Sequence, residues 1–356
     1  MDCPEVKNMD NENKIKKNPL SFQIDPDLFG KASDEEKAQV VTQRESVSFM
    51  KDAMRRLVRN KMAMTCLVIL ILITLIAIFV PMFYPYNYTQ QDVTAKYLEP
   101  FEYSRKEMTK INKGEFVFPH IMGTDNLGRD YAIRVIYGTR ISLMVGFVSA
   151  LIVVIIGILY GSISGYFGGK VDIIMMRIVD IIYSLPDVLI VILLSVAIKD
   201  VISLSKNQLI IKLGAGMISI FIVFGLLYWV GMARQVRGQI LSIKEQEYVL
   251  AARAMGASPM HIIMKHMIPN CVSVIIITAA MQIPSAIFTE SFLSFVGMGV
   301  SMPMPSLGSL ASDARSGLVS YPYMLIFPAA TIFLIVLSFN LLGNGLRDAF
   351  DPKLRS

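Results

Sequence analysis

Few residues of this chain are of types that could do chemistry within its apolar segments. Asp187 and Glu290 each lie in a long apolar run, where a charged side chain is costly and needs a structural or functional reason. Each carboxylate could face a water-filled path and meet a cationic group, or it could hydrogen-bond to a neighbouring helix. The three histidines, at positions 120, 261 and 266, are too scattered to predict a metal site. We therefore predict two candidate path residues and no catalytic residue.

Enzyme chemistry is not indicated anywhere in the sequence. An enzyme within a membrane would need a convergent set such as paired aspartates, a Ser–His pair or clustered histidines, and no such set is present. Cys3, Cys66 and Cys271 lack the spacing of a metal site or a disulfide framework. A glycine–lysine pair that could suggest a phosphate loop fails that pattern at Ser164 and Val171. We expect a protein that is not an enzyme and binds no cofactor itself.

Six apolar runs supply the elements that would position the two carboxylates. Each run is about 20 residues long, enough to cross the hydrocarbon core of a bilayer. Backbone polar groups in lipid must be satisfied internally, so the runs are predicted to be helices. Hydrophobic residues make up 54% of the 356 and charged residues 17%, as expected for an integral membrane protein. The predicted spans are 62–83, 142–166, 171–198, 213–233, 271–295 and 323–342.

Lysine and arginine near the ends of the runs predict the orientation. Arg55, Arg56, Arg59 and Lys61 precede the first run, and basic residues also dominate the loop 234–270. With six crossings, both termini are then cytoplasmic. The net charge of +6 follows from this asymmetry, since no basic patch interleaved with aromatic residues indicates nucleic-acid binding.

The remaining segments complete the predicted organisation. Residues 1–46 are rich in Asn, Lys, Asp and Glu and are expected to form a polar cytoplasmic tail. Residues 47–61 carry one apolar stripe and are predicted to form an amphipathic helix on the inner membrane surface, or a plain extension of the first span. Residues 84–141 form an extracytoplasmic segment. A core at 142–346 holds five spans, and 347–356 is a cytoplasmic tail.

The most informative block of the chain lies in the loop 234–270, from Glu247 to Ser258. Ala251, Ala252 and Ala254 favour helix and allow another backbone to come close. Gly256 can end this helix in a left-handed conformation, and Ser258 with Pro259 can start another. Two short helices at a sharp corner would form a rigid knob. The alternative is an ordinary helical loop with small residues.

This block resembles the cytoplasmic coupling loop, the "EAA" loop, of ABC-importer permeases, in which a glycine follows the alanines and a proline closes the motif. Ala251, Ala252, Gly256 and Pro269 hold the matching positions, and Leu250 stands where the family has a glutamate. The resemblance implies that the block binds a soluble ATPase. The residues implied in coupling are Glu247, Tyr248, Ala251, Ala252, Arg253, Met255, Gly256, Ala257 and Ser258.

Individual roles follow from this resemblance. Tyr248 and Met255 are expected to fill a groove on the ATPase. Ala251 and Ala252 would give close approach, and Arg253 would make a polar contact at the rim.

A second motif precedes the second run and contains Gly123-Thr124-Asp125 and Gly128-Arg129-Asp130. Its turn residues permit tight backbone, and Arg129 can pair with either aspartate. The motif resembles the signature of the C-type subunit of dipeptide, oligopeptide and nickel ABC importers. We expect it to fold the external segment over the span ends, with substrate contact as the alternative.

Two further patterns predict how the spans pack. Gly157, Gly161 and Gly165 recur at every fourth position of the second run, which favours close approach of another helix. Arg177 and Asp180 are three apart on the third run, which predicts an ion pair.

The resemblance covers the chain from about Met50 to its end and implies an all-α, six-span permease subunit with the ABC type I importer fold. It implies four partners: a homologous permease, two cytoplasmic ABC ATPases that carry ATP and Mg, and an extracytoplasmic solute-binding protein. The implied location is the cell membrane of a prokaryote.

The substrate stays open between oligopeptides, dipeptides and nickel chelates or other small solutes. A stand-alone secondary transporter is a further alternative, although it would build its own ion site from repeated halves and no repeat is evident.

Overall fold

The computed structural model describes residues 49–204, 207–300 and 304–350. The chain divides into two units, 1–49 and 50–356, and only the second is described below. The predicted polar tail 1–46 and the last six residues lie outside the described residues. Within the described ranges, every regular element is a helix, as the sequence predicts, and one isolated bridge joins Thr124 to Asp130.

Five helical runs in the described part of the chain are long and apolar enough to cross a membrane. A sixth is possible where α6 (Gly169–Ser184) and α7 (Asp187–Ser203) pass the same test together, bent by 90° at a break. The expectation of six spans therefore holds if this bent pair is counted as one. The five runs are α3 (Lys61–Phe83), α5 (Tyr131–Phe167), α9 with α10 (Ala215–Lys244), α12 to α13 (Pro259–Val296) and α15 (Tyr323–Phe350).

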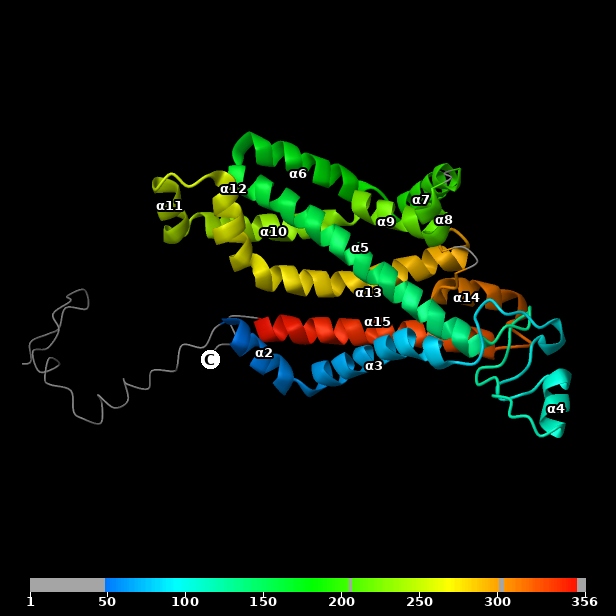
Figure 1. The fold of residues 1–356 in the computed structure, drawn as a ribbon. Coiled ribbons are helices and arrows are strands. Elements are labelled where there is room, and N and C mark those ends of the chain that lie inside the picture. The colour runs from blue at the N-terminus through cyan, green and yellow to red at the C-terminus, as the bar shows by residue number, and fades with distance from the viewer. Residues whose placement is uncertain (1–48, 205–206, 301–303, 351–356) are drawn as a thin grey trace, which may run out of the picture. The chain divides into compact units, whose positions relative to one another are not determined.

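The shorter elements connect these helices (Figure 1). They are α2 (Phe49–Arg59), α4 (Arg105–Asn112), α8 (Gln208–Leu213), α11 (Glu247–Ala254), α14 (Leu307–Asp313) and the turns η2 (Val93–Ala95), η3 (Ile263–Met267), η4 (Ile268–Cys271) and η5 (Ala314–Gly317). Within the long runs, α9 is Ala215–Leu227, α10 is Trp229–Lys244, α12 is Pro259–Ile262 and α13 is Val272–Val296.

The prediction of the third run as one continuous helix is wrong. Leu185 has extended backbone, with φ −78° and ψ 143°, and ends α6. Pro186 follows it, and the proline ring disfavours helical backbone in the preceding residue. The proline therefore explains the bend between α6 and α7.

The second span begins earlier than the apolar run that predicted it. α5 starts at Tyr131 instead of Ser142, because the Asp130 side chain caps it by accepting a hydrogen bond of 2.9 Å from the Ile133 amide. Its 37 residues extend about 56 Å, well beyond the hydrocarbon core. The predicted external segment 84–141 thus includes the first three turns of α5.

The glycine face of α5 packs against α10, as predicted. A Cβ atom added to Gly161 would lie 2.4 Å from the carbonyl oxygen of Ala233, and one added to Gly157 would lie 2.4 Å from the Met232 side chain. Gly165 meets Ile240 in the same way. Small residues let two membrane helices approach closely, where packing replaces the hydrophobic effect. The α5–α10 pair is therefore a tightly packed centre of this unit.

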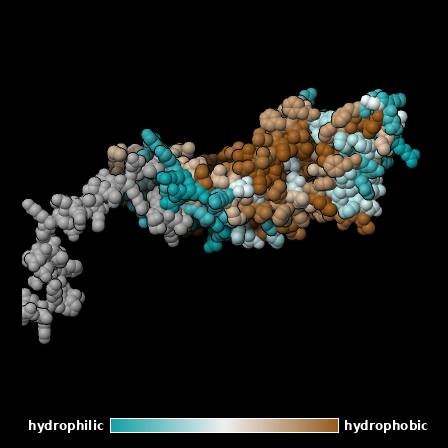
Figure 2. Space-filling view, turned by 90° about the horizontal axis from the view of Figure 1, so that it is seen from below, coloured by the Kyte–Doolittle hydropathy of each residue, from teal (hydrophilic) through white to brown (hydrophobic). Residues whose placement is uncertain are grey.

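The outer surface is apolar over a broad band. Figure 2 shows hydrophobic side chains gathered across the middle of one face and hydrophilic ones toward its ends. α3 contributes side chains that are about half exposed, among them Ile71, Leu72 and Phe79. An apolar patch of this extent marks contact with lipid or a partner.

The predicted amphipathic stripe of residues 47–61 is split by the structure. In α2, Ala53 and Leu57 are buried, whereas Met50, Met54 and Val58 are exposed. The helix is present, and its position on a membrane surface stays a prediction.

The predicted ion pair between Arg177 and Asp180 does not form. Asp180 pairs instead with Arg234 of α10, at 2.7 Å. The neighbouring Asp172 accepts two hydrogen bonds of 2.5 Å from Arg237 of the same helix. The basic side chains of α10 lie opposite these carboxylates, so the ion pairs form between helices and not within α6.

Candidate functional site

The block predicted to couple the protein to an ATPase folds as two helices at a corner. α11 ends at Ala254, and Gly256 follows with φ +80°, a left-handed conformation that glycine adopts without strain. Ser258 caps α12 by accepting a hydrogen bond from the His261 amide at 3.4 Å, and Pro259 occupies the first turn. The helix–corner–helix geometry is thus confirmed.

One side of this knob is anchored in the protein. Val249 of α11 is buried with Ile262 and Met267, which follow the corner, in the same hydrophobic cluster as the α10 residues that face α5. Since a packed interior resists deformation, the knob is joined firmly to the spans.

Four apolar side chains of the knob are exposed. Met255, at the corner, is 82% exposed, and Tyr248 is 43% exposed. Leu250 and Met260 are exposed as well. We define these four residues as the apolar tip. Methionine and tyrosine suit a contact surface, because methionine adapts its shape and tyrosine supplies a rigid ring.

The predicted role of Ala252 as a surface for close approach is wrong. Ala252 is 3% exposed and belongs to the internal cluster, whereas Ala251 is exposed. The helical repeat turns adjacent residues to different faces, and here Ala252 faces the interior while Ala251 faces outward. Arg253 lies with its guanidinium 5.4 Å from the centre of the Tyr166 ring, and so ties α11 to the end of α5.

Pro269 lies beyond the short second helix of the knob, within a longer helical run. The backbone passes through a π turn (η3) and a 3₁₀ turn (η4), and then continues as α13. The Asn270 side-chain amide donates a hydrogen bond of 2.6 Å to the carbonyl oxygen of His266, which gives this backbone acceptor of η3 a partner. A wide turn before proline accommodates the ring, so α12 and α13 belong to one helical run.

Glu290 is enclosed and does not face a path in this structure. Its carboxylate is fully buried and accepts hydrogen bonds from Ser142 of α5 at 2.8 Å and from Ser294 at 2.7 Å. The alternative that Glu290 hydrogen-bonds to a neighbouring helix is therefore confirmed. The sequence could not decide this, because Ser142 is distant in the chain.

Asp187 lies in a different position, as the first residue of α7 directly after the bend. It is exposed and borders a cavity of about 470 Å³, together with Tyr183, Pro186 and Tyr228. The structure thus separates the two predicted path residues.

The external signature motif is a folding element. Asp125 is buried, pairs with Arg129 at 2.6 Å and accepts a further hydrogen bond from Arg134. Arg134 also reaches Asp313 at 3.3 Å, which joins α5 to the end of α14. Of the two predicted partners of Arg129, Asp125 is the one used. The motif therefore holds the external segment to the span ends.

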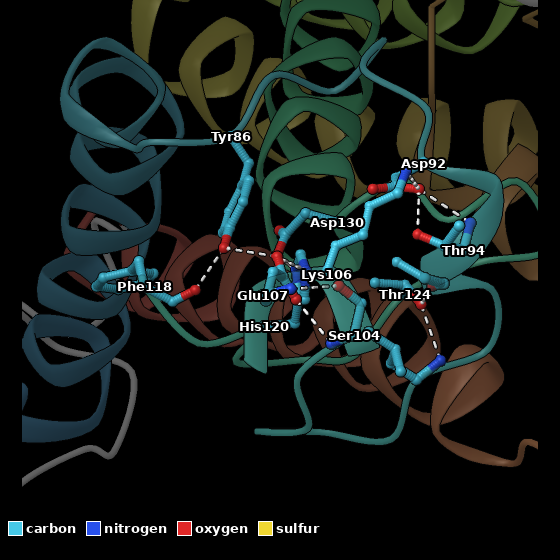
Figure 3. A network of polar contacts seen from close by, with 12 residues as sticks. Tyr86, Asp92, Thr94, Ser104, Lys106, Glu107, Phe118, His120, Thr124 and Asp130 are labelled. Atoms are coloured by element: carbon cyan, nitrogen blue, oxygen red, sulfur yellow. Dashed lines mark hydrogen bonds and ion pairs between the residues drawn. The ribbon is translucent and has the colours of Figure 1, made fainter. Parts of the chain in front are cut away.

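A second polar chain in the same segment was not predicted (Figure 3). Nδ1 of His120 lies 2.7 Å from Asp130, and Nε2 lies 3.2 Å from Glu107. The Tyr86 ring stacks on the imidazole, with centroids 4.5 Å apart. Burial by itself lowers the pKa of His120, but the hydrogen bond and charge of Asp130 and the charge of Glu107 outweigh it, so the pKa is raised. This series of polar contacts, from Glu107 through His120 to Asp130, connects α4 to the start of α5.

Metal ligation has no geometric support in the described ranges, where no three His, Cys, Asp or Glu side chains are grouped to hold an ion.

Two family matches cover most of the chain. Residues 157–356 match the family described as the binding-protein-dependent transport system inner membrane component. Residues 48–100 match the N-terminal TM domain of oligopeptide transport permease C.

Similar full-length proteins agree with these matches. The chain is 42% identical over 312 residues to the oligopeptide transport system permease protein OppC of Bacillus subtilis (strain 168), covering 88% of this chain and 92% of that protein. It is 42% identical over 313 residues to the dipeptide transport system permease protein DppC of the same organism, covering 88% of each. Identity to OppC of Escherichia coli (strain K12) is 39% over 311 residues, covering 87% and 93%.

Proposed function

This chain belongs to the inner membrane components of binding-protein-dependent transport systems, as a C-type permease of ABC peptide importers, and we propose that it forms half of a path for peptides across the membrane. Oligopeptides and dipeptides are the substrates in the names of its relatives, which favours them over nickel chelates. The observation that carries the proposal is the anchored knob with its apolar tip, which supplies a surface for a soluble motor.

The proposed assembly contains a homologous permease, two cytoplasmic ATPases that bind ATP and Mg, and an extracytoplasmic binding protein. α6 supports the second permease, because it exposes Ile173, Ile174, Ile178 and Ile181 along its length. The location we propose is the inner or plasma membrane of a prokaryote, with both termini cytoplasmic. The basic residues Arg55 to Lys61, before α3, support this orientation.

In the proposed mechanism, ATP binding closes the ATPases and moves the knob. Tyr248 and Met255 sit in a groove of the ATPase, and Arg253 lies at its rim. Ala251 allows the ATPase to approach closely, and Glu247, Gly256, Ala257 and Ser258 shape the two short helices. Because the buried face of α11 is packed against the spans and α12 continues into α13, the motion passes to the path as a rigid-body shift.

Reconstitution tests this function directly. We expect vesicles that contain the chain, its partner permease, the two ATPases and the binding protein to accumulate peptide when ATP is supplied on the ATPase side. Omitting the chain should abolish uptake. Uptake driven by an ion gradient without ATP would contradict the proposal and favour a secondary transporter.

A further inference from the structure

A cavity of about 470 Å³ is bordered by the bend between α6 and α7 and by the junction of α9 and α10. The bend is 90° and lies at Leu185 and Pro186. The junction lies at Tyr228. A Cβ atom added to Gly231 beside the junction would meet nothing within 4 Å. The opening therefore lies beside an interrupted helix pair, α6 with α7, and a continuous run, α9 with α10.

The bend has a physical requirement of its own. Non-helical backbone at membrane depth is tolerated only where it is buried in protein or lines a water-filled space. The bend comes after the 16 residues of α6, about 24 Å from the Gly169 end, which is within the thickness of a hydrocarbon core. Leu185 and Pro186 are exposed on this chain. A water-filled path beside the bend would solvate the non-helical backbone and would also explain why Leu185 and Pro186 are exposed.

Asp187 places a negative charge at the edge of this cavity. No basic side chain in the described ranges lies within ion-pair distance of its carboxylate, which accepts a hydrogen bond of 2.7 Å from the Val188 amide. Arg234 is already engaged, with Asp180 at 2.7 Å and with the Tyr183 ring at 4.3 Å. The charge of Asp187 is thus left for a group from outside the chain.

The aromatic lining suits a cation as well. Tyr183 and Tyr228 both border the cavity, and the Arg234 guanidinium covers one face of the Tyr183 ring. A carboxylate with tyrosine faces nearby attracts an ammonium group by charge and by cation–π interaction, and both are stronger out of bulk water.

We propose that this cavity is a stop on the peptide path, at which Asp187 binds an ammonium group of the passing peptide between Tyr183 and Tyr228. The inference rests on the proposed function. The ammonium can belong to the amino terminus or to a lysine side chain, and the chemistry of the site is the same for both.

The test compares peptide uptake by the complete reconstituted transporter carrying Asp187→Asn with uptake by the wild type. Three probes are used: trialanine, N-acetyl-trialanine, and N-acetyl-Ala-Lys-Ala. Each is supplied above the concentration that saturates the binding protein, so the variant-to-wild-type ratio reports the permease. Asp200→Asn is the matched control, since Asp200 is an exposed aspartate about 20 Å further along α7.

We expect Asp187→Asn to lower trialanine uptake about tenfold, on the order of 1.4 kcal/mol, while N-acetyl-trialanine uptake stays within about twofold. Asp187→Glu should restore part of the loss, and Asp200→Asn should match the wild type. A parallel loss for N-acetyl-Ala-Lys-Ala would identify any ammonium as the ligand, and no loss would identify the amino terminus.

Equal ratios for trialanine and N-acetyl-trialanine would overturn the inference, whether both fall or neither does. Membrane levels and co-purification of the ATPases show that the variant has folded and assembled. Absence of ATP-dependent peptide uptake by the wild type would instead refute the proposed function, and this inference with it.

Discussion

The imidazole of His120 lies between the carboxylates of Asp130 and Glu107, largely removed from water. Both neighbours favour its protonated form more than burial disfavours it. Asp130 also caps α5, so the protonation of one histidine bears on how the external segment meets the span. A single polar residue in this segment therefore affects stability by holding two helices together.

The raised pKa of His120 predicts a pH dependence of stability. A folded-state pKa above the unfolded value stabilises the fold fully below about pH 6.5, and the stabilisation is lost as pH rises through the folded pKa. We expect hydrogen-exchange protection of residues 93–130, corrected for intrinsic rates, to fall as pH rises above 6.5. His120→Gln should abolish that fall, and His261→Gln, at an exposed site, should keep it. An unchanged pH profile in His120→Gln would contradict the assignment.

Asp125 predicts a large loss of stability on neutralisation. Asp125→Asn leaves Arg129 and Arg134 without their shared buried carboxylate. We expect the free energy of unfolding to fall by about 3 to 5 kcal/mol, because uncompensated buried charge is strongly destabilising. Denaturant unfolding of the purified protein measures this. Asp52→Asn, which removes one exposed i,i+4 pair, should change it by about 0.5 kcal/mol or less. Similar values for the two variants would show that Asp125 is not the centre of the motif.

At the scale of elements, the contact of α5 with α10 fixes the centre of the membrane unit. Its three glycines bring backbone against backbone, and the ion pairs of Asp172 and Asp180 with α10 hold α6 beside it. α10 leads directly into the knob. The knob is therefore connected to a tightly packed pair of helices.

Gly161→Ala tests that packing. The added Cβ would lie 2.4 Å from the Ala233 carbonyl oxygen, so the helices must separate. We expect a loss of about 1 to 3 kcal/mol in the free energy of unfolding, the usual range for overpacking. Gly238→Ala on α10 is the control, because its Cβ meets open space and should cause no loss. Equal stability of the two variants would mean that α5 and α10 pack more loosely than described.

Local patterns predicted the elements better than the contacts between them. The corner of the knob follows from Gly256, Ser258 and Pro259, whose conformational preferences act within a few residues. The bend at Leu185 was missed because hydropathy counts apolar residues and ignores the effect of Pro186 on the residue before it. Arg234, the partner of Asp180, and Ser142, one partner of Glu290, come from other helices, and His120 meets Asp130 and Glu107 only after the segment folds. A sequence alone does not place these groups together.

At the scale of the whole molecule, the two ends of the membrane unit have different tasks. The segment 84–130 is held by buried ion pairs at one end, whereas the opposite end carries the knob and its apolar tip (Figure 1). The bend with Asp187 lies along the chain between them. This division suits a permease that receives substrate on one side and is driven from the other.

The central claim is that the apolar tip contacts an ATPase. Cross-linking in the assembled transporter tests it, with Met255→Cys as the probe, in a chain lacking Cys3; the remaining Cys66 and Cys271 are buried. Phe116→Cys, a highly exposed site in the external segment, is the control. The account predicts that a short thiol–amine reagent links position 255 to the ATPase, with a yield that changes when ATP binds, and that position 116 gives no such product. An active transporter in which position 255 never links to the ATPase would contradict it.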